Sequence, residues 1–200
     1  MLPRLLLATG NAGKARELKT LLRGVPYQLV LPQDIGLACD IEENGGTYQE
    51  NACIKALALA NQSGFKTLAD DSGLEVDALG GEPGIFSSRF GGKGSTDQQK
   101  YQLIIQRLKG IQGSRRSARF ICVVAIADTG IIQATFSGEC RGFIAEIPRG
   151  ENHFGYDPIF VLPELDKTMA ELSEEIKNKY SHRSKAVCKA RSFLMTTGNQ

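Results

Sequence analysis

The segment Phe120–Ala127 reads FICVVAIA and contains no charged side chain. A strand of this composition is apolar on both faces, so both of its faces have to be buried. A turn at Asp128-Thr-Gly130 follows, and Ile131–Ile147 has the pattern of a second long strand. The two segments therefore predict an antiparallel hairpin with one strand deep inside a sheet.

The rest of the chain alternates between strand and helix patterns. Further strands are expected at Leu5–Ala8, near Tyr27–Val30 and in the segment TLADDSGLEVDALGG, which is expected to break off at its acids and glycine. A first helix is expected to carry Ala15, Leu18 and Leu22 on its apolar face and to end at Gly24. Three more helices are expected to begin at the capping patterns Thr47–Glu50, Ser95–Gln98 and Thr168–Glu171. The last helix is expected to begin near Ser181. This order predicts an α/β fold with a mixed sheet.

Size and composition restrict the class of protein further. The 200 residues are enough for one domain or for two lobes of one domain, and 42% hydrophobic with 23% charged residues indicates a globular chain. No apolar run approaches the ~20 residues that span a bilayer, and Met1–Arg4 leads directly into a strand. We expect a cytoplasmic protein, with residues 1–200 as a single domain, that binds neither membranes nor nucleic acid, since the net charge is only +2.

The cysteines do not predict a disulfide framework or a zinc site. They are five in number, scattered, and never spaced as Cys-x-x-Cys. We expect them to be buried, reduced thiols.

A glycine-rich turn joins the first strand to the first helix in LLLATGNAGKAREL. The P-loop template fails here, because Ala8 and Ala15 occupy the positions that require glycine and Ser or Thr. A strand, a turn and a helix start still present backbone N–H groups and the positive end of a helix dipole to an anion. Lys14 would add a charge to such a phosphate cradle. A plain turn with a surface lysine is the alternative interpretation.

Acidic residues gather in two short segments. Asp70 and Asp71 follow a short apolar strand, and because successive strand residues point to opposite faces, one of them is expected to face a site. Together with Glu42 and Glu43 they provide hard oxygen ligands, which suit Mg²⁺ beside a phosphate site. Solvated turn acids are the alternative. A histidine-based metal site is disfavoured because the chain has two histidines.

Two later segments suggest a place for a flat, polar ligand. FGYDPIF places Phe154 and Tyr156 in a rigid loop, where an aromatic ring can stack on a base. KNKYSHRSKA then offers donors from Ser181, His182 and Arg183 at a helix start. The alternatives are an aromatic core turn and a basic helix face.

These motifs occur together in one known family. TGNAGKAREL, EENGGTYQENACIKA, LADDSGLEVDALGGEPGIFSSRF, FGYDPIF and KNKYSHRSKA follow one another in this order. The chain thereby resembles the inosine/xanthosine triphosphate pyrophosphatase family, from Leu5 to the last helix. The resemblance implies that TGNAGK is a phosphate-binding loop unrelated to the P-loop.

The resemblance also implies an activity and a fold. Members are Mg²⁺-dependent enzymes that split a non-standard purine nucleoside triphosphate, such as ITP, dITP or XTP, into the monophosphate and pyrophosphate, which keeps deaminated purines out of DNA and RNA. The implied fold is an elongated mixed sheet with flanking helices in two lobes around a central cleft, and members are usually homodimers.

Roles are transferred to the residues that match the family's motifs. Asp71 would accept the proton of the attacking water, and Glu43 and Asp71 would hold Mg²⁺. The remaining residues would bind the substrate: the triphosphate is assigned to Thr9, Gly10, Asn11, Ala12, Gly13, Lys14 and Lys55, a neighbouring position to Ser72, and the base to Phe154, Gly155, Tyr156, Asp157, Lys177, His182 and Arg183. The chain departs from the common pattern at Ser88 and at His153, which receives no role.

Two other functions compete with this one. A related pyrophosphatase for pyrimidine or modified-base triphosphates, as in the septum-associated nucleotide pyrophosphatases, is disfavoured by FGYDP and SHR. A nucleotide-binding regulatory module without turnover is disfavoured by the intact Glu43 and Asp71. Donors from His182 and Arg183 would suit a 6-oxo purine and disfavour the 6-amino group of adenine, but the sequence does not show how GTP would be rejected.

Overall fold

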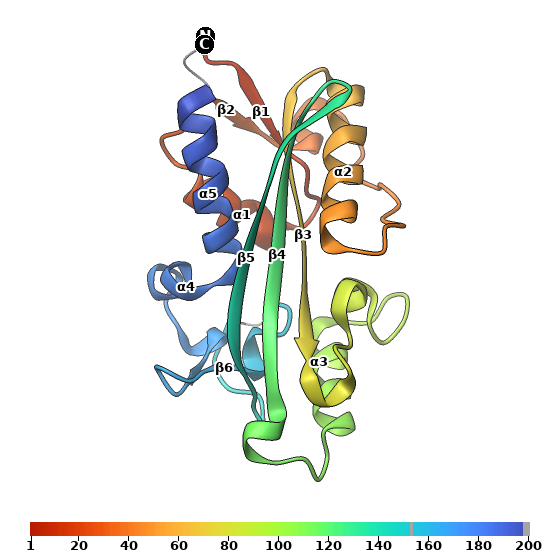
Figure 1. Cartoon of the computed structure of the whole chain (residues 1–200), viewed down its shortest axis with the longest axis vertical. Helices are drawn as coiled ribbons and strands as arrows, with labels where there is room; N and C mark the ends of the chain where they lie inside the picture. The colour runs from red at the N-terminus through yellow and green to blue at the C-terminus, as the bar shows by residue number, and fades with distance from the viewer. Residues whose placement is uncertain (153, 198–200) are drawn as a thin grey trace. The chain divides into compact units, whose positions relative to one another are not determined.

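The structure is a computed structural model that describes residues 1–152 and 154–197 (Figure 1). His153, which received no role, lies outside the described residues. The strands and α-helices are β1 (Arg4–Leu7), α1 (Ala12–Leu21), β2 (Gln28–Val30), α2 (Tyr48–Ser63), β3 (Lys66–Val76), α3 (Asp97–Arg107), β4 (Ser117–Asp128), β5 (Ile131–Ile144), β6 (Phe160–Leu162), β7 (Lys167–Thr168), α4 (Glu174–Tyr180) and α5 (His182–Thr197). Short 3₁₀ helices are η1 (Pro32–Ile35), η2 (Asp77–Leu79), η3 (Gly84–Arg89), η4 (Gly113–Arg116), η5 (Asp157–Ile159) and η6 (Met169–Glu171).

Seven strands form one mixed sheet in the order β2-β1-β3-β4-β5-β6-β7. β1 pairs in parallel with β2 and β3, whereas β6 pairs antiparallel with β5 and β7. The apolar segment Phe120–Ala127 lies in β4, at the centre of this order, and its Ala125, Ile126 and Ala127 are fully buried. The predicted α/β fold and the predicted hairpin are confirmed.

Chain contacts divide the molecule into two compact units. Unit 1 contains residues 1–71, 122–138 and 183–200, and unit 2 contains residues 72–121 and 139–182. β3, β4 and β5 each contribute residues to both units. The predicted arrangement of two lobes around a cleft stays a prediction.

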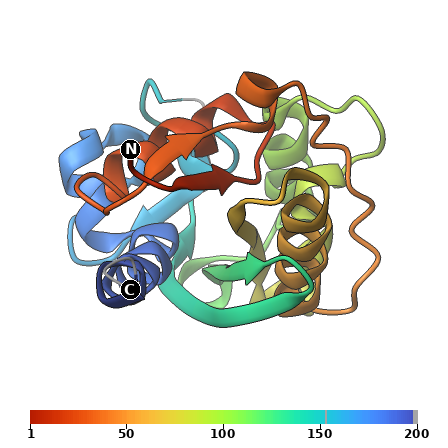
Figure 2. The ribbon, with the colours of Figure 1, turned by 90° about the horizontal axis from the view of Figure 1, so that it is seen from above.

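In unit 1, α1 and α5 share one apolar core with the strands. Figures 1 and 2 show the course of the two helices beside the strands. The core residues include Leu5 and Leu7 of β1, Leu18 and Leu22 at α1, Val124 and Ile126 of β4, and Val187 and Leu194 of α5. Tight packing of this face positions the two helix starts, at residues 12 and 182, that carry candidate site residues.

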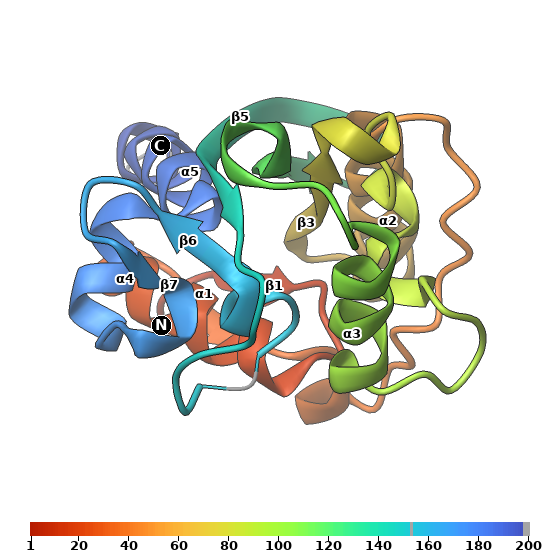
Figure 3. The same ribbon diagram turned by 90° about the horizontal axis from the view of Figure 1, so that it is seen from below.

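The core of unit 2 contains residues of β3, α3, β4, β5 and the segment 156–169. Figure 3 labels α3 and β6, two of the elements that contribute to it. Ile104 and Leu108 contribute from the end of α3, and Ile159 and Phe160 contribute from the end of the FGYDPIF segment; all four are fully buried. Tyr156 belongs to the same core, which fixes the aromatic loop to the body of the unit.

Several predicted details need correction. β3 does not break off at its acids but continues through Asp70, Asp71 and Gly73 to Val76, because both carboxylates have polar partners within the structure. The predicted capping box at residues 95–98 is shifted by one: Thr96 caps α3 with Gln99. All five cysteines are free, but only Cys122 and Cys140 are buried.

The other predicted helix starts agree with the structure. Thr47 caps α2, Gly64 ends it with a positive φ of 69°, and Thr168 and Glu171 form the capping box of η6. Among the described helices, none is long and apolar enough to cross a membrane.

Candidate active site

The loop after β1 is held in a defined shape by its own side chains. The Thr9 hydroxyl accepts a hydrogen bond from the backbone N–H of Asn11 at 3.1 Å. Asn11 is the N-cap of α1, and its side-chain oxygen accepts from the N–H of Lys14 at 3.0 Å. The start of α1 therefore presents its first N–H groups and the positive end of its dipole at this loop.

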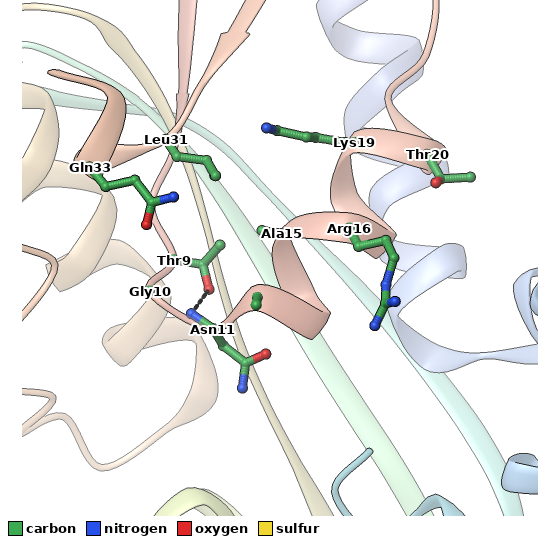
Figure 4. Close-up of a pocket in the computed structure, with 10 residues that line it drawn as sticks. Thr9, Gly10, Asn11, Ala15, Arg16, Lys19, Thr20, Leu31 and Gln33 are labelled. Carbon is green, nitrogen blue, oxygen red and sulfur yellow. Dashed lines mark hydrogen bonds between the residues drawn. The ribbon is translucent and has the colours of Figure 1, made fainter. Parts of the chain in front are cut away.

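A groove of about 400 Å³ runs from this loop between α1 and the segment that contains η1 (Figure 4). Its charged lining residues, Arg16 and Lys19, are both basic, and Figure 4 shows Lys19 on α1 and Gln33 on η1 on opposite sides of it. The surroundings of the loop are thus positive on the α1 side, which suits an anion.

Asp70 lies on one face of β3 and is the centre of a buried charge network. Its Oδ2 is 3.0 Å from Lys14 Nζ and 3.3 Å from Arg183 Nε, and Arg183 also pairs with Glu17. The side chains of Asp70 and Arg183 are 1% and 3% exposed. Burial alone would raise the pKa of Asp70, but Lys14 and Arg183 outweigh it and hold that pKa well below its usual range.

Asp71 points to the other face of the strand, as the alternation predicted. Its Oδ2 accepts a hydrogen bond from Asn51 Nδ2 at 3.1 Å, and Asn51 belongs to α2. Burial, with a further contribution from the negative charge of Glu43, raises the pKa of Asp71 above its ordinary value. Two adjacent residues of one strand therefore have pKa values shifted in opposite directions.

Glu43 and Lys55 form an ion pair on the Asp71 side. Burial would lower the pKa of Lys55, but the surrounding carboxylates of Asp70 and Glu43 outweigh it and raise that pKa, so the amine stays charged. Each lysine assigned to the triphosphate, Lys14 and Lys55, is thus paired with a carboxylate of unit 1.

In unit 2, the aromatic loop is held by contacts to other segments of the unit. Gly155 N donates to Asp97 Oδ2 at 2.8 Å, and the Tyr156 hydroxyl donates to the carbonyl oxygen of Ser87 at 2.8 Å. Lys177 Nζ lies 2.6 Å from Asp157 Oδ2 and 5.0 Å from the centre of the Phe154 ring. The Lys177–Asp157 pair is almost fully buried, with exposures of 6% and 5%.

The two aromatic residues of this loop, Phe154 and Tyr156, differ in burial and in contacts. Tyr156 is buried, and its hydroxyl donates a hydrogen bond to the carbonyl oxygen of Ser87. Burial raises the pKa of that hydroxyl. Phe154 is only partly buried and lies beside the ammonium of Lys177. Phe154 is therefore the more exposed of the two rings, whereas Tyr156 anchors the loop.

The residues assigned to the base are divided between the two units. His182 belongs to unit 2 and stacks on Phe120, with ring centres 4.6 Å apart. Arg183 belongs to unit 1, where its guanidinium pairs with Asp70 and Glu17. Ser72 is the first residue of unit 2 and is half-buried. The roles of all the residues assigned to the substrate, Arg183 and Ser72 included, stay predictions.

The sequence analysis missed two residues that shape these sites. Asn51 lies fully buried on α2, and Asp97 receives the Gly155 N–H at the start of α3. A signal for Asn51 was present: Asn51 and Lys55 are four residues apart on a helix whose other inward residues are apolar, such as Ala52 and Leu59. Asp97 had no comparable signal, because an acid in the first turn of a helix is common.

The α/β fold thus contains a basic loop at a helix start, a buried carboxylate pair with adjacent lysines, and a separate aromatic loop. The chain matches the model of the Ham1 family over residues 5–193. It belongs to this family.

Similar proteins cover nearly the whole chain. The dITP/XTP pyrophosphatase of Bacillus subtilis is 44% identical, and the match covers 94% of this chain and 96% of that protein. The dITP/XTP pyrophosphatase of Thermus thermophilus is 46% identical, and the match covers 92% of this chain and 88% of that protein. The solved structure of a HAM1 protein from Coxiella burnetii is 40% identical in sequence and has a TM-score of 0.88. The match covers 98% of this chain and 100% of that protein. The mixed seven-stranded sheet with flanking helices is thus the fold of this family.

Proposed function

We propose that this protein hydrolyses non-standard purine nucleoside triphosphates, such as ITP, dITP and XTP, to the monophosphate and pyrophosphate. The observation that carries the proposal is the 44% identity, over 94% of the chain, to a curated dITP/XTP pyrophosphatase. The paired carboxylates and lysines of unit 1 support it, because a triphosphate brings about four negative charges that need cations.

Mg²⁺ is the cofactor we propose for this reaction. Glu43 and Asp71 fit it because both are oxygen ligands. Burial, and then the negative charge of Glu43, raise the pKa of Asp71, and a bound cation would relieve the repulsion between the two carboxylates. Within residues 1–152 and 154–197 no group of three or more acidic, Cys or His side chains could hold a metal ion, so water and phosphate oxygens would complete the ligand set. Bound Mg²⁺ would neutralise charge that develops on the phosphates.

The two lysines would exchange partners when the substrate binds. Lys14 and Lys55 are neutralised by Asp70 and Glu43 in the structure. A triphosphate offers stronger acceptors, and an ammonium has three donors, so each lysine can contact a phosphate oxygen. Together with the N–H groups at the start of α1, they would bind the triphosphate.

Asp71 is the proposed acceptor for the proton of the attacking water. Its pKa is raised by burial and by Glu43, which makes the carboxylate a better base than an exposed aspartate. The Asn51 hydrogen bond fixes its orientation. Attack at the α-phosphorus then releases pyrophosphate.

Base selection is assigned to unit 2. Phe154 would stack on the base, and Lys177 and His182 would contribute donors that suit a 6-oxo purine, with Arg183 of unit 1 as the further predicted donor. The carboxylate of Asp157 is paired with Lys177, so donors directed at position 6 would leave the 6-amino group of adenine without an acceptor. Such a mismatch discriminates by about 10⁴- to 10⁵-fold.

A panel of triphosphates tests the proposal. ITP, dITP, XTP, GTP, ATP, CTP and UTP are incubated with the protein and Mg²⁺, and pyrophosphate and orthophosphate are measured separately. We expect pyrophosphate from the first three. Preferred turnover of a pyrimidine triphosphate would favour the related pyrophosphatase class, and tight ITP binding without turnover would favour the regulatory module.

Assembly and location are proposed from the family resemblance. We expect a homodimer, which light scattering on the purified protein tests directly, and a cytoplasmic enzyme that acts on the free nucleotide pool. A monomer at the concentrations used for turnover would contradict the assembly.

A further inference from the structure

Asn51 is a polar side chain in a fully buried position. It lies in the first turns of α2 and is 0% exposed. Asparagine is a poor helix former, and a buried amide is costly unless its donors and acceptor are used. A residue with both disadvantages has to be explained by its partners.

The amide of Asn51 has one partner on each side. Its Nδ2 donates to Asp71 Oδ2 at 3.1 Å, and its Oδ1 accepts from the backbone N–H of Gly45 at 2.8 Å. The two partners determine which way the amide faces. The Gly45 N–H is a donor and needs the amide oxygen of Asn51, whereas the ionised Asp71 carboxylate is an acceptor and needs the amide nitrogen. Asn51 therefore connects β3 to the segment that precedes α2.

That segment carries Glu43 and is seated tightly on the start of α2. A Cβ atom at Gly45 would lie 2.8 Å from Asn51 Oδ1 and 2.7 Å from the Cβ of Glu50, so the close approach requires glycine. The next N–H, that of Gly46, donates to Glu50 Oε2 at 2.7 Å. Glu43 is thus two residues from the point at which its segment is attached to Asn51.

We propose that Asn51 is a positioning residue that sets the separation of the Glu43 and Asp71 carboxylates and thereby forms the cation site. The inference rests on the proposed function, because that function gives the two acids a cation to hold. Two carboxylates that repel each other need an external restraint to stay together before the cation binds. The Asn51 amide supplies it by binding Asp71 Oδ2 with its nitrogen and the N–H of Gly45 with its oxygen.

The principal test variant is Asn51→Leu, which keeps the approximate shape and removes both hydrogen bonds. The matched control is Glu50→Gln, because Glu50 is the neighbouring residue, binds the neighbouring N–H of Gly46 and is exposed. The probe is Mn²⁺, titrated calorimetrically into nucleotide-free protein. Turnover of ITP at saturating Mg²⁺ and thermal unfolding are measured on the same samples.

For Asn51→Leu we expect the Mn²⁺ dissociation constant to rise about 10- to 100-fold and kcat to fall by about the same factor. KM for ITP should change less than about 3-fold, since the residues proposed to bind the nucleotide are intact. Glu50→Gln should match the wild type in all three quantities. Wild-type Mn²⁺ affinity in folded Asn51→Leu would overturn the proposal.

Asn51→Asp decides the question if Asn51→Leu does not fold. Aspartate has the shape of asparagine and still accepts from Gly45 N–H, but it replaces the donor to Asp71 with a repelling carboxylate. We expect kcat at saturating Mg²⁺ to fall at least about 10-fold, whereas wild-type kcat would overturn the proposal. If the wild-type protein hydrolyses no triphosphate, the proposed function fails, but the Mn²⁺ titrations still test the role of Asn51.

Discussion

The two candidate sites are built by different means. In unit 1 the groups are charged and close together, so that Asp70 and Asp71 have oppositely shifted pKa values and both lysines have carboxylate partners. In unit 2 a loop is fixed by hydrogen bonds from Gly155 and Tyr156 and by one ion pair. The first arrangement suits a ligand that is recognised by charge, and the second suits one that is recognised by shape and donor pattern.

This difference predicts that conservative charge changes are most damaging in unit 1. Asp71→Asn keeps the shape and removes both the charge and the basicity. We expect kcat to fall about 10²- to 10⁴-fold from loss of the general base alone, while equilibrium binding of ITP changes little. Kinetics and calorimetric ITP binding measure both quantities.

The same substitution should not reduce stability. The folded protein raises the pKa of Asp71, so this carboxyl lowers the stability of the folded state once the pH exceeds its ordinary pKa. At pH 7, Asp71→Asn should therefore unfold at the same temperature as the wild type or higher. Glu42→Gln, at an exposed acid beside Glu43, is the control for kinetics. Near wild-type kcat for Asp71→Asn would contradict the mechanism.

Asp70→Asn should have the opposite profile. It removes one acidic partner of the buried Arg183 guanidinium, which also pairs with Glu17, so the free energy of unfolding should fall by about 3 kcal/mol. Its loss of kcat should be smaller than that of Asp71→Asn. Chemical denaturation at pH 7 gives the stability.

The pH dependence gives a separate test of Asp70. The pKa of Asp70 is lower in the folded than in the unfolded protein. Its carboxylate therefore stabilises the folded state fully above the unfolded pKa of about 4, and this stabilisation is lost as the pH falls toward the folded pKa. The stability difference between wild type and Asp70→Asn should therefore shrink below about pH 4. A difference that is constant down to pH 2 would show that Asp70 acts through packing instead of charge.

A smaller effect is expected from Phe154→Ala in unit 2. Stacking on an aromatic ring contributes about 1–3 kcal/mol per base, which corresponds to a rise in KM of about 5- to 150-fold. Because charge neutralisation in unit 1 is unaffected, kcat should change less than KM. Phe86→Ala, at a ring that is 55% exposed, is the control. A fall in kcat with unchanged KM would break the assignment of Phe154 to base binding.

The sequence predicted the fold well where patterns are local. The apolar segment of β4, the helix caps at Thr47 and Gly64 and the hairpin at residues 128–130 follow from composition and spacing. The prediction that β3 ends at its acids was wrong. Acids and glycine disfavour a strand, but here the carboxylates have polar partners that the sequence does not reveal. Lys14, Arg183 and Asn51, which bind Asp70 and Asp71, come from distant parts of the chain.

The candidate site could be predicted as a set of residues but not as an arrangement. The motifs named Asp71, Glu43 and both lysines, yet only the structure shows that each lysine already has an acidic partner. It likewise shows that Tyr156 anchors its loop through Ser87 while Phe154 remains partly exposed. Such pairings depend on contacts between residues far apart in sequence, which no local pattern contains.

The most direct test of the central claim compares ITP with ATP under identical conditions with Mg²⁺ and identifies the released phosphate. The account predicts that kcat/KM for ITP exceeds that for ATP by several powers of ten, because the proposed donors match a 6-oxo purine, and that pyrophosphate is the direct product. Equal kcat/KM values for the two nucleotides would contradict the base selection assigned to unit 2. Orthophosphate with a nucleoside diphosphate left behind would contradict the site of attack assigned to unit 1.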